Sequence, residues 1–157
     1  MAKVIVSRRV AAPIEHVWDS WDDFGNIYKY NPVLKHSRLL NNEDVATRVG
    51  ARRHCDMADG KNWVREEIID YRPRKSIKID VYEGSLPLKS MHATIEFEKI
   101  AEHRTRVRMT AEFEPKFGVV GRLMVPLMKR QFAPMLQSLL DGNAAYVERG
   151  QVVAAAA

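Results

Sequence analysis

The sequence is poor in the features that build disulfides, metal sites and membrane spans. Its one cysteine, Cys55, excludes a disulfide within the chain. The five histidines lack the spacing that a metal site needs, so neither a metal nor another cofactor is predicted. No apolar run approaches the roughly 20 residues that span a bilayer. Residues 1–6 lack the pattern of a secretory signal, and together with the lone thiol this predicts a cytoplasmic protein.

Acidic residues are fewer than basic ones, with 20 Asp and Glu against 25 Lys and Arg, so the net charge is +5. A basic balance raises nucleic acid as a partner. The basic residues are dispersed, however, and the densest cluster, Arg72 to Lys75, is typical of a turn. No basic helix or stacked-aromatic motif accompanies them. We therefore predict a solvated, charged surface and no nucleic-acid partner, while the oligomeric state stays open.

The length and patterning predict one α+β domain over residues 1–150, followed by a disordered tail at 151–157. Residues 3–11 alternate as a strand does. A short helix opens at Ala12-Pro13, with Pro at the first helical position. Its apolar side chains recur with the helical period: Ile14, Val17, Trp18 and Trp21. A second short helical piece starts at Asp22-Asp23 and ends before Pro32.

Six further strands are predicted from alternating polarity and from turn residues between them. Their ranges are 33–41, 49–57, 62–71, 76–83, 89–99 and 105–114. In the last two, apolar residues share one face and charged residues the other, which indicates an antiparallel sheet with one wet face and one covered face.

The cover is a helix predicted over about residues 117–148, with an apolar stripe centred on Phe132. Pro126 and Pro134 fall inside it and are expected to kink or interrupt it. Leu123 and Leu127 lie off the main stripe, so the first turns are apolar nearly all round. Two interpretations remain: extra packing against loops, or a mobile apolar lid over a pocket mouth.

A predicted hairpin places two charges on an apolar face. Asp59-Gly60 separates two strand-like runs, and both residues tolerate positive φ. A two-residue loop at this position pairs Arg53 with Glu66 and Cys55 with Val64 on the more apolar face of the hairpin. Because such a charged pair is costly to desolvate, it favours a pocket with polar groups inside over a dry core. The alternative is a structural pair that fixes strand register.

Six short segments, in this order and spacing, carry a family resemblance. They are Ala12–Trp18, Asp23-Phe24, Asn31-Pro32, Val49–Arg53, Asp59-Gly60 and Glu66. The chain resembles the SRPBCC superfamily over nearly its whole length. This superfamily includes START-like, birch-pollen-allergen-like and polyketide cyclase/dehydrase-like proteins. The resemblance implies a helix-grip fold, in which a curved seven-stranded antiparallel sheet wraps a long C-terminal helix and leaves a hydrophobic cavity between them.

The resemblance also implies a ligand and a set of site residues. Members bind small hydrophobic or amphipathic molecules such as lipids and polyketides, and aromatase/cyclase relatives polarise ligand oxygens with an interior arginine and tyrosine. Arg53 matches that arginine by position and Tyr30 matches the tyrosine by region. With Glu66 they are the candidate catalytic residues. The predicted ligand-binding residues are Arg53, Glu66, Cys55, Met57, Met91, Met109, Phe113, Met128 and Phe132.

Three functions remain open on the sequence. The first is a carrier that binds a hydrophobic or amphipathic molecule, with Tyr30 at the entrance and a pliable, methionine-rich wall. The second is a cyclase or dehydratase in which Arg53 stabilises charge and Tyr30 or Glu66 transfers a proton. The third is a lipid or quinone chaperone whose apolar turns make transient membrane contact. Cys55 has no evident base beside it and is expected to be a buried structural thiol.

Overall fold

The computed structural model describes residues 1–41 and 48–153. The elements follow one another as β1 (Ala2–Val10), α1 (Ile14–Asp22), the 3-10 helix η1 (Phe24–Lys29), β2 (Leu34–Leu39), β3 (Arg52–Met57), β4 (Trp63–Arg72), β5 (Ser76–Gly84), β6 (Leu88–Ala101), β7 (Arg104–Pro115) and α2 (Gly118–Arg149). Every predicted element is present in the predicted order, so the α+β class is confirmed.

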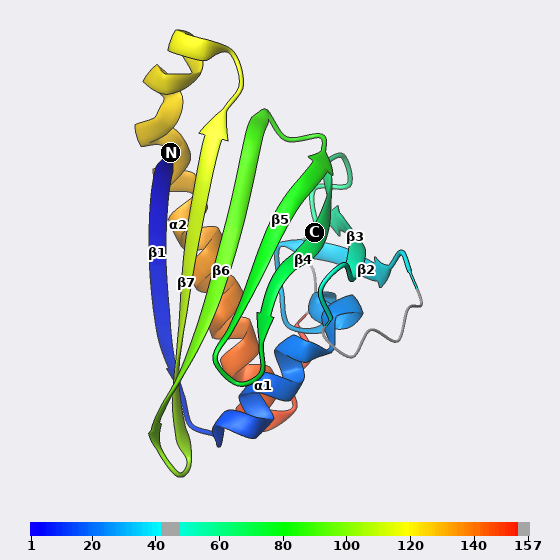
Figure 1. The fold of residues 1–157 in the computed structure, drawn as a ribbon, viewed down its shortest axis with the longest axis vertical. Coiled ribbons are helices and arrows are strands. Elements are labelled where there is room, and N and C mark those ends of the chain that lie inside the picture. The colour runs from blue at the N-terminus through cyan, green and yellow to red at the C-terminus, as the bar shows by residue number, and fades with distance from the viewer. Residues whose placement is uncertain (42–47, 154–157) are drawn as a thin grey trace.

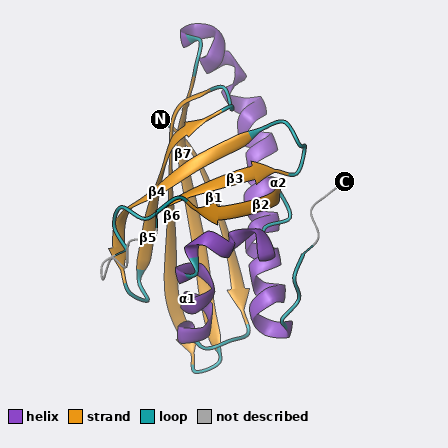
Figure 2. Cartoon of the chain, turned by 90° about the vertical axis from the view of Figure 1, so that its right-hand side faces the viewer, coloured by secondary structure: helices purple, strands orange, loops and turns teal. Residues whose placement is uncertain are grey.

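The seven strands form one antiparallel sheet in the order β1-β7-β6-β5-β4-β3-β2. The first strand of the chain pairs with the last, from Ala2 opposite Phe113 to Val10 opposite Thr105. Figure 1 shows the sheet with α2 behind it, and the turned view in Figure 2 shows α2 running along one face of the curved sheet. This is the helix-grip arrangement that the sequence predicted.

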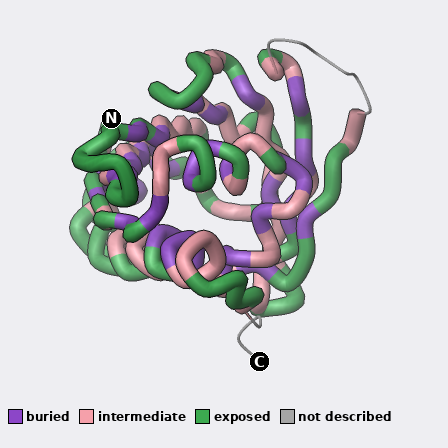
Figure 3. The backbone as a smooth tube through the Cα atoms, turned by 90° about the horizontal axis from the view of Figure 1, so that it is seen from below, coloured by how far each residue is buried: buried purple, intermediate pink, exposed green. Residues whose placement is uncertain are grey.

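The core lies between the sheet and α2. On β7, Val107, Met109, Ala111 and Phe113 are buried at alternate positions, as one covered face of a sheet requires. Figure 3 shows buried and exposed residues following one another along the chain, with the exposed ones mainly at the periphery of the molecule. From α2, Leu139, Leu140 and Ala144 complete this core.

The two short helices close one end of this core. Val17, Trp18 and Trp21 of α1 are buried, which confirms the predicted apolar face. Pro13 does not occupy the first helical position, because its ψ of 150° is extended and the helix begins at Ile14. Its carbonyl accepts the first helical hydrogen bonds, so Pro13 acts as the N-cap.

Of the two outcomes predicted for the prolines of the long helix, a kink or an interruption, the interruption does not occur. Both Pro126 and Pro134 lie inside α2, which runs unbroken for 32 residues. Both prolines are exposed, so water can solvate the carbonyl that each leaves without an N–H partner. Figure 2 shows α2 bent near its N-terminal end, the form in which a helix accommodates an interior proline.

Some predicted boundaries are corrected by backbone conformation. The strand predicted at 49–57 begins only at Arg52, because Gly50 adopts a φ of +93°, outside the β region. The strand predicted at 33–41 is limited to Leu34–Leu39. Residues 42–47, which follow the strand predicted at 33–41, lie outside the described residues.

The C-terminal end is described as far as Val153, whose N–H donates to the carbonyl of Lys29 at 2.9 Å. The rest of the predicted tail, 154–157, lies outside the described residues. Within the described chain, no helix has both the length and the apolar character to cross a membrane.

Candidate ligand-binding site

The β3–β4 hairpin has the predicted register but not the predicted loop. Arg53 pairs with Glu66 and Cys55 with Val64. The loop is longer than two residues: the Met57 N–H donates to the Asn62 carbonyl at 2.9 Å, which closes a four-residue loop over 58–61. Gly60 alone of the two turn residues has positive φ, at +72°. The loop gains one residue on each side, so the cross-strand pairs stay the same.

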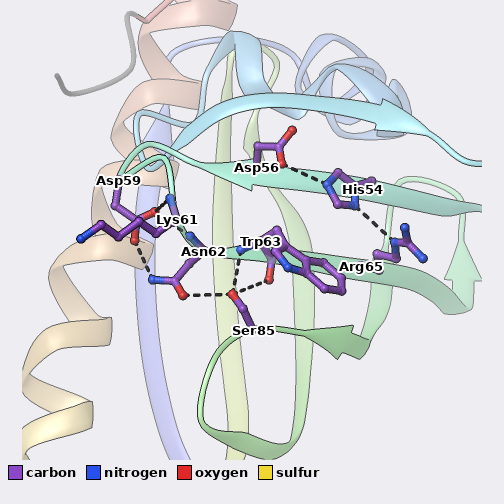
Figure 4. A network of polar contacts seen from close by, with 8 residues as sticks. All are labelled: His54, Asp56, Asp59, Lys61, Asn62, Trp63, Arg65 and Ser85. Carbon is purple, nitrogen blue, oxygen red and sulfur yellow. Dashed lines mark hydrogen bonds and ion pairs between the residues drawn. The ribbon is translucent and has the colours of Figure 1, made fainter.

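Polar contacts on the outer side of this hairpin hold it in place (Figure 4). The Asp59 carboxylate accepts from the backbone N–H groups of Lys61 and Asn62, both at 2.8 Å. Further along, His54 lies between Asp56 at 3.0 Å and Arg65 at 3.2 Å. The positions of His54, Asp56 and Arg65 alternate with those of Arg53, Cys55 and Glu66. The outer network therefore leaves those three residues on the inner face.

Arg53 and Glu66 form a buried ion pair on that inner face. The Arg53 Nε donates to Glu66 Oε2 at 2.6 Å, and the two side chains are 4% and 18% exposed. The Arg53 Nη1 donates to the Phe24 carbonyl at 2.9 Å, and the Phe24 ring lies 3.8 Å from the guanidinium carbon. Burial opposes the charge on Arg53, but the Glu66 carboxylate together with Cys55 and Tyr30 outweighs this effect and leaves the pKa of Arg53 raised. The pair is therefore charged and mutually neutralised.

Two polar atoms of this pair are left for a ligand. Neither Arg53 Nη2 nor Glu66 Oε1 makes a hydrogen bond to another described residue. No fully buried side-chain nitrogen or oxygen of the described residues lacks a partner, so these two atoms are not sealed in the protein. Both residues line the same cavity. The cavity wall therefore includes an N–H donor and a carboxylate acceptor from the ion pair.

The cavity between the sheet and α2 has a volume of about 120 Å³ and a mainly apolar wall. Of the predicted ligand-binding residues, the wall contains Arg53, Glu66, Cys55, Met57, Met91, Met109 and Phe132. The volume is smaller than the roughly 300–1,000 Å³ of common ligand pockets and near the ~150 Å³ of a cavity that holds benzene. As it stands, the cavity accommodates one ring or a short chain.

Three predicted residues lie off the wall. Phe113 is fully buried behind it, with its ring edge-on to Phe132 at 5.0 Å between centroids. Met128 packs against the core from α2. Tyr30 lies in the core and not at the expected entrance, and its hydroxyl donates to the Ser20 carbonyl at 3.1 Å. Burial raises the pKa of Tyr30, so its proton is held tightly.

Cys55 lies beside the ion pair without being activated by it. Its Sγ is 3.9 Å from Glu66 Oε2. Burial, followed by the negative charge of Glu66, raises the pKa of the thiol to about 12. The thiol is therefore protonated at neutral pH, as expected for a structural cysteine.

Several wall residues were not predicted from the sequence. They are Trp21, Ile27, Asn31, Val33, Leu34, Val64, Ile79, Val81, Leu86, Ala93, Met135, Leu136 and Leu139. The apolar stripe around Phe132 already marks Met135, Leu136 and Leu139 as inward. By contrast, Leu86 reaches the wall from the β5–β6 loop, which has no periodic pattern. Among the described residues no three metal-ligating side chains lie together.

The structure is similar to solved structures of the same fold. The Zhui aromatase/cyclase of a Streptomyces species matches with a TM-score of 0.80 and 16% identity, covering 94% of each chain. A START superfamily protein from Mycobacterium smegmatis matches with a TM-score of 0.79 and 17% identity, covering 95% of this chain and 99% of the other. A Thermus thermophilus protein has a TM-score of 0.77, 23% identity and the same coverage.

These likenesses show that the fold is the helix-grip fold of START-like proteins. The chain belongs to the family described as polyketide cyclase / dehydrase and lipid transport, whose model matches residues 1–148. Among curated proteins, none matches this sequence.

Proposed function

We propose that this protein binds a small amphipathic molecule in the cavity between the sheet and α2, with the polar end of the ligand at Arg53 and Glu66. One observation carries the proposal: an apolar cavity of about 120 Å³ has on its wall an ion pair with one N–H donor and one carboxylate oxygen that bond to no other described residue. The family description and the likeness to a START superfamily protein support this class of function.

The charge state of the pair selects the chemistry of the ligand head. Glu66 already neutralises Arg53, so an anionic carboxylate would bring an uncompensated charge into a buried site. A hydroxyl, a phenol or an enol accepts from Arg53 Nη2 and donates to Glu66 Oε1. Such a neutral group leaves no buried polar atom unpaired. The preferred ligand therefore has a neutral hydroxylated head on an apolar body.

The flexible wall sets the size of the ligand body. Met57, Met91, Met109 and Met135 line the cavity. Methionine side chains are unbranched and change shape at low cost, so the cavity can enlarge around a body larger than one ring. Lipid and polyketide ligands need such an enlargement.

The test compares three probes of similar size: phenol, toluene and benzoate. Binding is measured by titration calorimetry and by the rise in thermal midpoint that a ligand of the folded state produces. We expect phenol to bind more tightly than toluene, and benzoate to bind least. Native mass spectrometry of the freshly purified protein checks for a copurified molecule of the same class.

The matched control fills the cavity without altering the ion pair. Ala93 lies on the wall, and Ala93→Leu adds side-chain volume there. This variant is expected to lose phenol binding while it keeps the Arg53–Glu66 pair. If phenol binds Ala93→Leu as well as the wild type, or if benzoate binds best, the proposal fails.

A cyclase or dehydratase activity is the second candidate. The observation that favours it is the same donor and acceptor. The arginine can polarise a ligand carbonyl, and the carboxylate beside it can accept a proton from the adjacent carbon. The raised pKa of Tyr30 and its place in the core count against Tyr30 as the proton donor. With a diketide thioester as probe, an enzyme loses turnover in Glu66→Gln and retains binding. A carrier shows no turnover in either protein.

A further inference from the structure

The first turns of α2 leave a group of large apolar side chains exposed. The group, here called the tip, comprises Phe117, Val119, Val120, Leu123, Met124 and Leu127, which are 47% to 77% exposed. Figure 1 shows this end of α2, in yellow, projecting past the end of the sheet. Other exposed apolar side chains of the described chain are scattered, as on most proteins, whereas a contiguous group marks an interaction surface.

The helix is apolar on both its inner and its outer side at the tip. Met128 and Phe132 turn inward and pack against the core. Leu123 and Leu127, one turn apart, are 77% and 48% exposed. Packing against the sheet therefore accounts for only one of the two apolar sides.

The backbone at the start of the tip is strained. Phe117 has a φ of +71°, which is rare for a bulky side chain, and its side chain is 74% exposed. The Lys116 N–H donates to the Pro87 carbonyl at 3.1 Å and fixes the preceding residue. Such strain persists only where the surrounding structure enforces it, and it clusters at functional sites; here it holds an exposed Phe at the start of α2.

The charged side chains of the segment that forms the tip have one sign, and the neighbouring Glu114 is paired with Lys89. Residues 116–140 contain four basic and no acidic side chains: Lys116, Arg122, Lys129 and Arg130, all exposed. This segment therefore holds most of the net charge of +5. A second copy of the chain on this surface would bring eight like charges together, so self-association is disfavoured. An anionic partner with an apolar interior complements both the charge and the side chains.

We propose that the tip docks on an anionic lipid bilayer, with the helix start lying in the interfacial plane. The apolar side chains enter the acyl boundary, and the four basic side chains contact lipid phosphates. This interaction goes beyond ligand binding and does not depend on it. Because Lys116 bonds to the β5–β6 loop that carries Leu86 on the cavity wall, docking places the cavity beside the bilayer.

Vesicle cosedimentation tests the docking. The full chain is mixed with vesicles of phosphatidylcholine alone or of equal parts phosphatidylcholine and phosphatidylglycerol. We expect binding to the anionic vesicles that weakens with salt. Leu123→Gln and Leu127→Gln each reduce the partition constant about tenfold, as expected for one leucine kept out of the acyl region. Lys129→Ala and Arg130→Ala each reduce it about fivefold, on anionic vesicles only.

Matched controls come from the same chain. Ile5 on β1 is 50% exposed, and Ile5→Gln is expected to leave vesicle binding unchanged. Arg104, exposed at the β6–β7 turn, supplies the charge control as Arg104→Ala. The proposal is overturned if the leucine variants bind vesicles like the wild type. It is also overturned if the control variants lose as much vesicle binding as the tip variants. A dimer in sedimentation velocity that Leu123→Gln abolishes, with no vesicle binding, also overturns it.

Discussion

Arg53 is a charged side chain held almost entirely out of water, and its environment accounts for that. The Glu66 carboxylate neutralises its charge, the Phe24 carbonyl accepts a second hydrogen bond from it, and the Phe24 ring covers one face of the guanidinium. Removing one member of such a pair leaves an unpaired buried charge. Removing both leaves only apolar and neutral groups.

Arg53→Met alone is expected to lower the free energy of unfolding by about 3 kcal/mol, because Glu66 is then buried without a partner. The double variant Arg53→Met/Glu66→Gln recovers most of that loss. Urea unfolding measures both. A double variant no more stable than Arg53→Met would contradict this account.

The neighbouring pair on the same two strands is the matched control. Arg52 and Glu67 face each other in the ladder at 3.0 Å between Nε and Oε1, but point to the other face. The Arg52 side chain is 50% exposed. Arg52→Met is therefore expected to leave the unfolding free energy nearly unchanged.

Cys55 makes stability depend on pH in the alkaline range. Burial raises the pKa of its thiol from 9.0 to about 12 in the folded state. The folded protein holds this proton more tightly, so the contribution is fully present below pH 9 and is lost as pH rises toward the folded pKa. Between these limits the free energy of unfolding falls by up to roughly 1.4 kcal/mol per pH unit.

Comparing the wild type with Cys55→Ala isolates this effect, because both proteins share the other titrating groups. Urea unfolding at pH 8 and pH 10.5 is expected to show a steeper loss of stability in the wild type. Equal slopes would mean that the thiol is not the group responsible.

Among the elements, α2 contains two poor helix formers, Gly142 and Pro134, whose replacement is expected to affect stability in opposite directions. Gly142 lies in its interior, where alanine would favour the helix by about 1 kcal/mol. A Cβ at Gly142 would overlap the carbonyl oxygen of Tyr30, so the glycine permits close contact between α2 and the end of η1. Pro134, by contrast, is exposed and removes one helical hydrogen bond.

Substitution of these two residues by alanine should therefore change the free energy of unfolding in opposite directions. Gly142→Ala is expected to destabilise the protein by about 2 kcal/mol, since the helix must move away from Tyr30. Pro134→Ala is expected to stabilise it by about 1–2 kcal/mol through the regained hydrogen bond and the better helix former. Thermal and urea unfolding measure both. A stabilising Gly142→Ala would show that the contact with Tyr30 is not tight.

In the whole molecule, the sheet depends on α2 for its covered face. The inner residues of β7, such as Met109 and Phe113, are buried by packing with the helix. A chain that ends before Gly118 is expected to lose cooperative unfolding and near-ultraviolet circular dichroism. Among the described residues, a chain that ends after Gly150 loses the backbone hydrogen bonds from Val153 to Lys29 and from Gln151 to Ala145, and is expected to unfold within about 1 kcal/mol of the full chain. A cooperative fold without α2 would contradict this.

Much of this protein follows from local sequence patterns. Alternating polarity locates the strands, and the helical period gives the buried face of α1. Asp59-Gly60 pairs Arg53 with Glu66 even though the loop is longer than expected, because it lengthens equally on both sides. Such features depend on neighbours in sequence or across one hairpin.

Other features depend on contacts between distant segments. The pairing of β1 with β7, the seating of Tyr30 in the core and the approach of Leu86 to the cavity join residues far apart in the chain. No local pattern specifies them. The sequence by itself therefore determined which residues alternate inward and that two opposite charges share an apolar face. Only the tertiary structure decided which inward residues enclose the cavity, because that depends on how the sheet curves around α2.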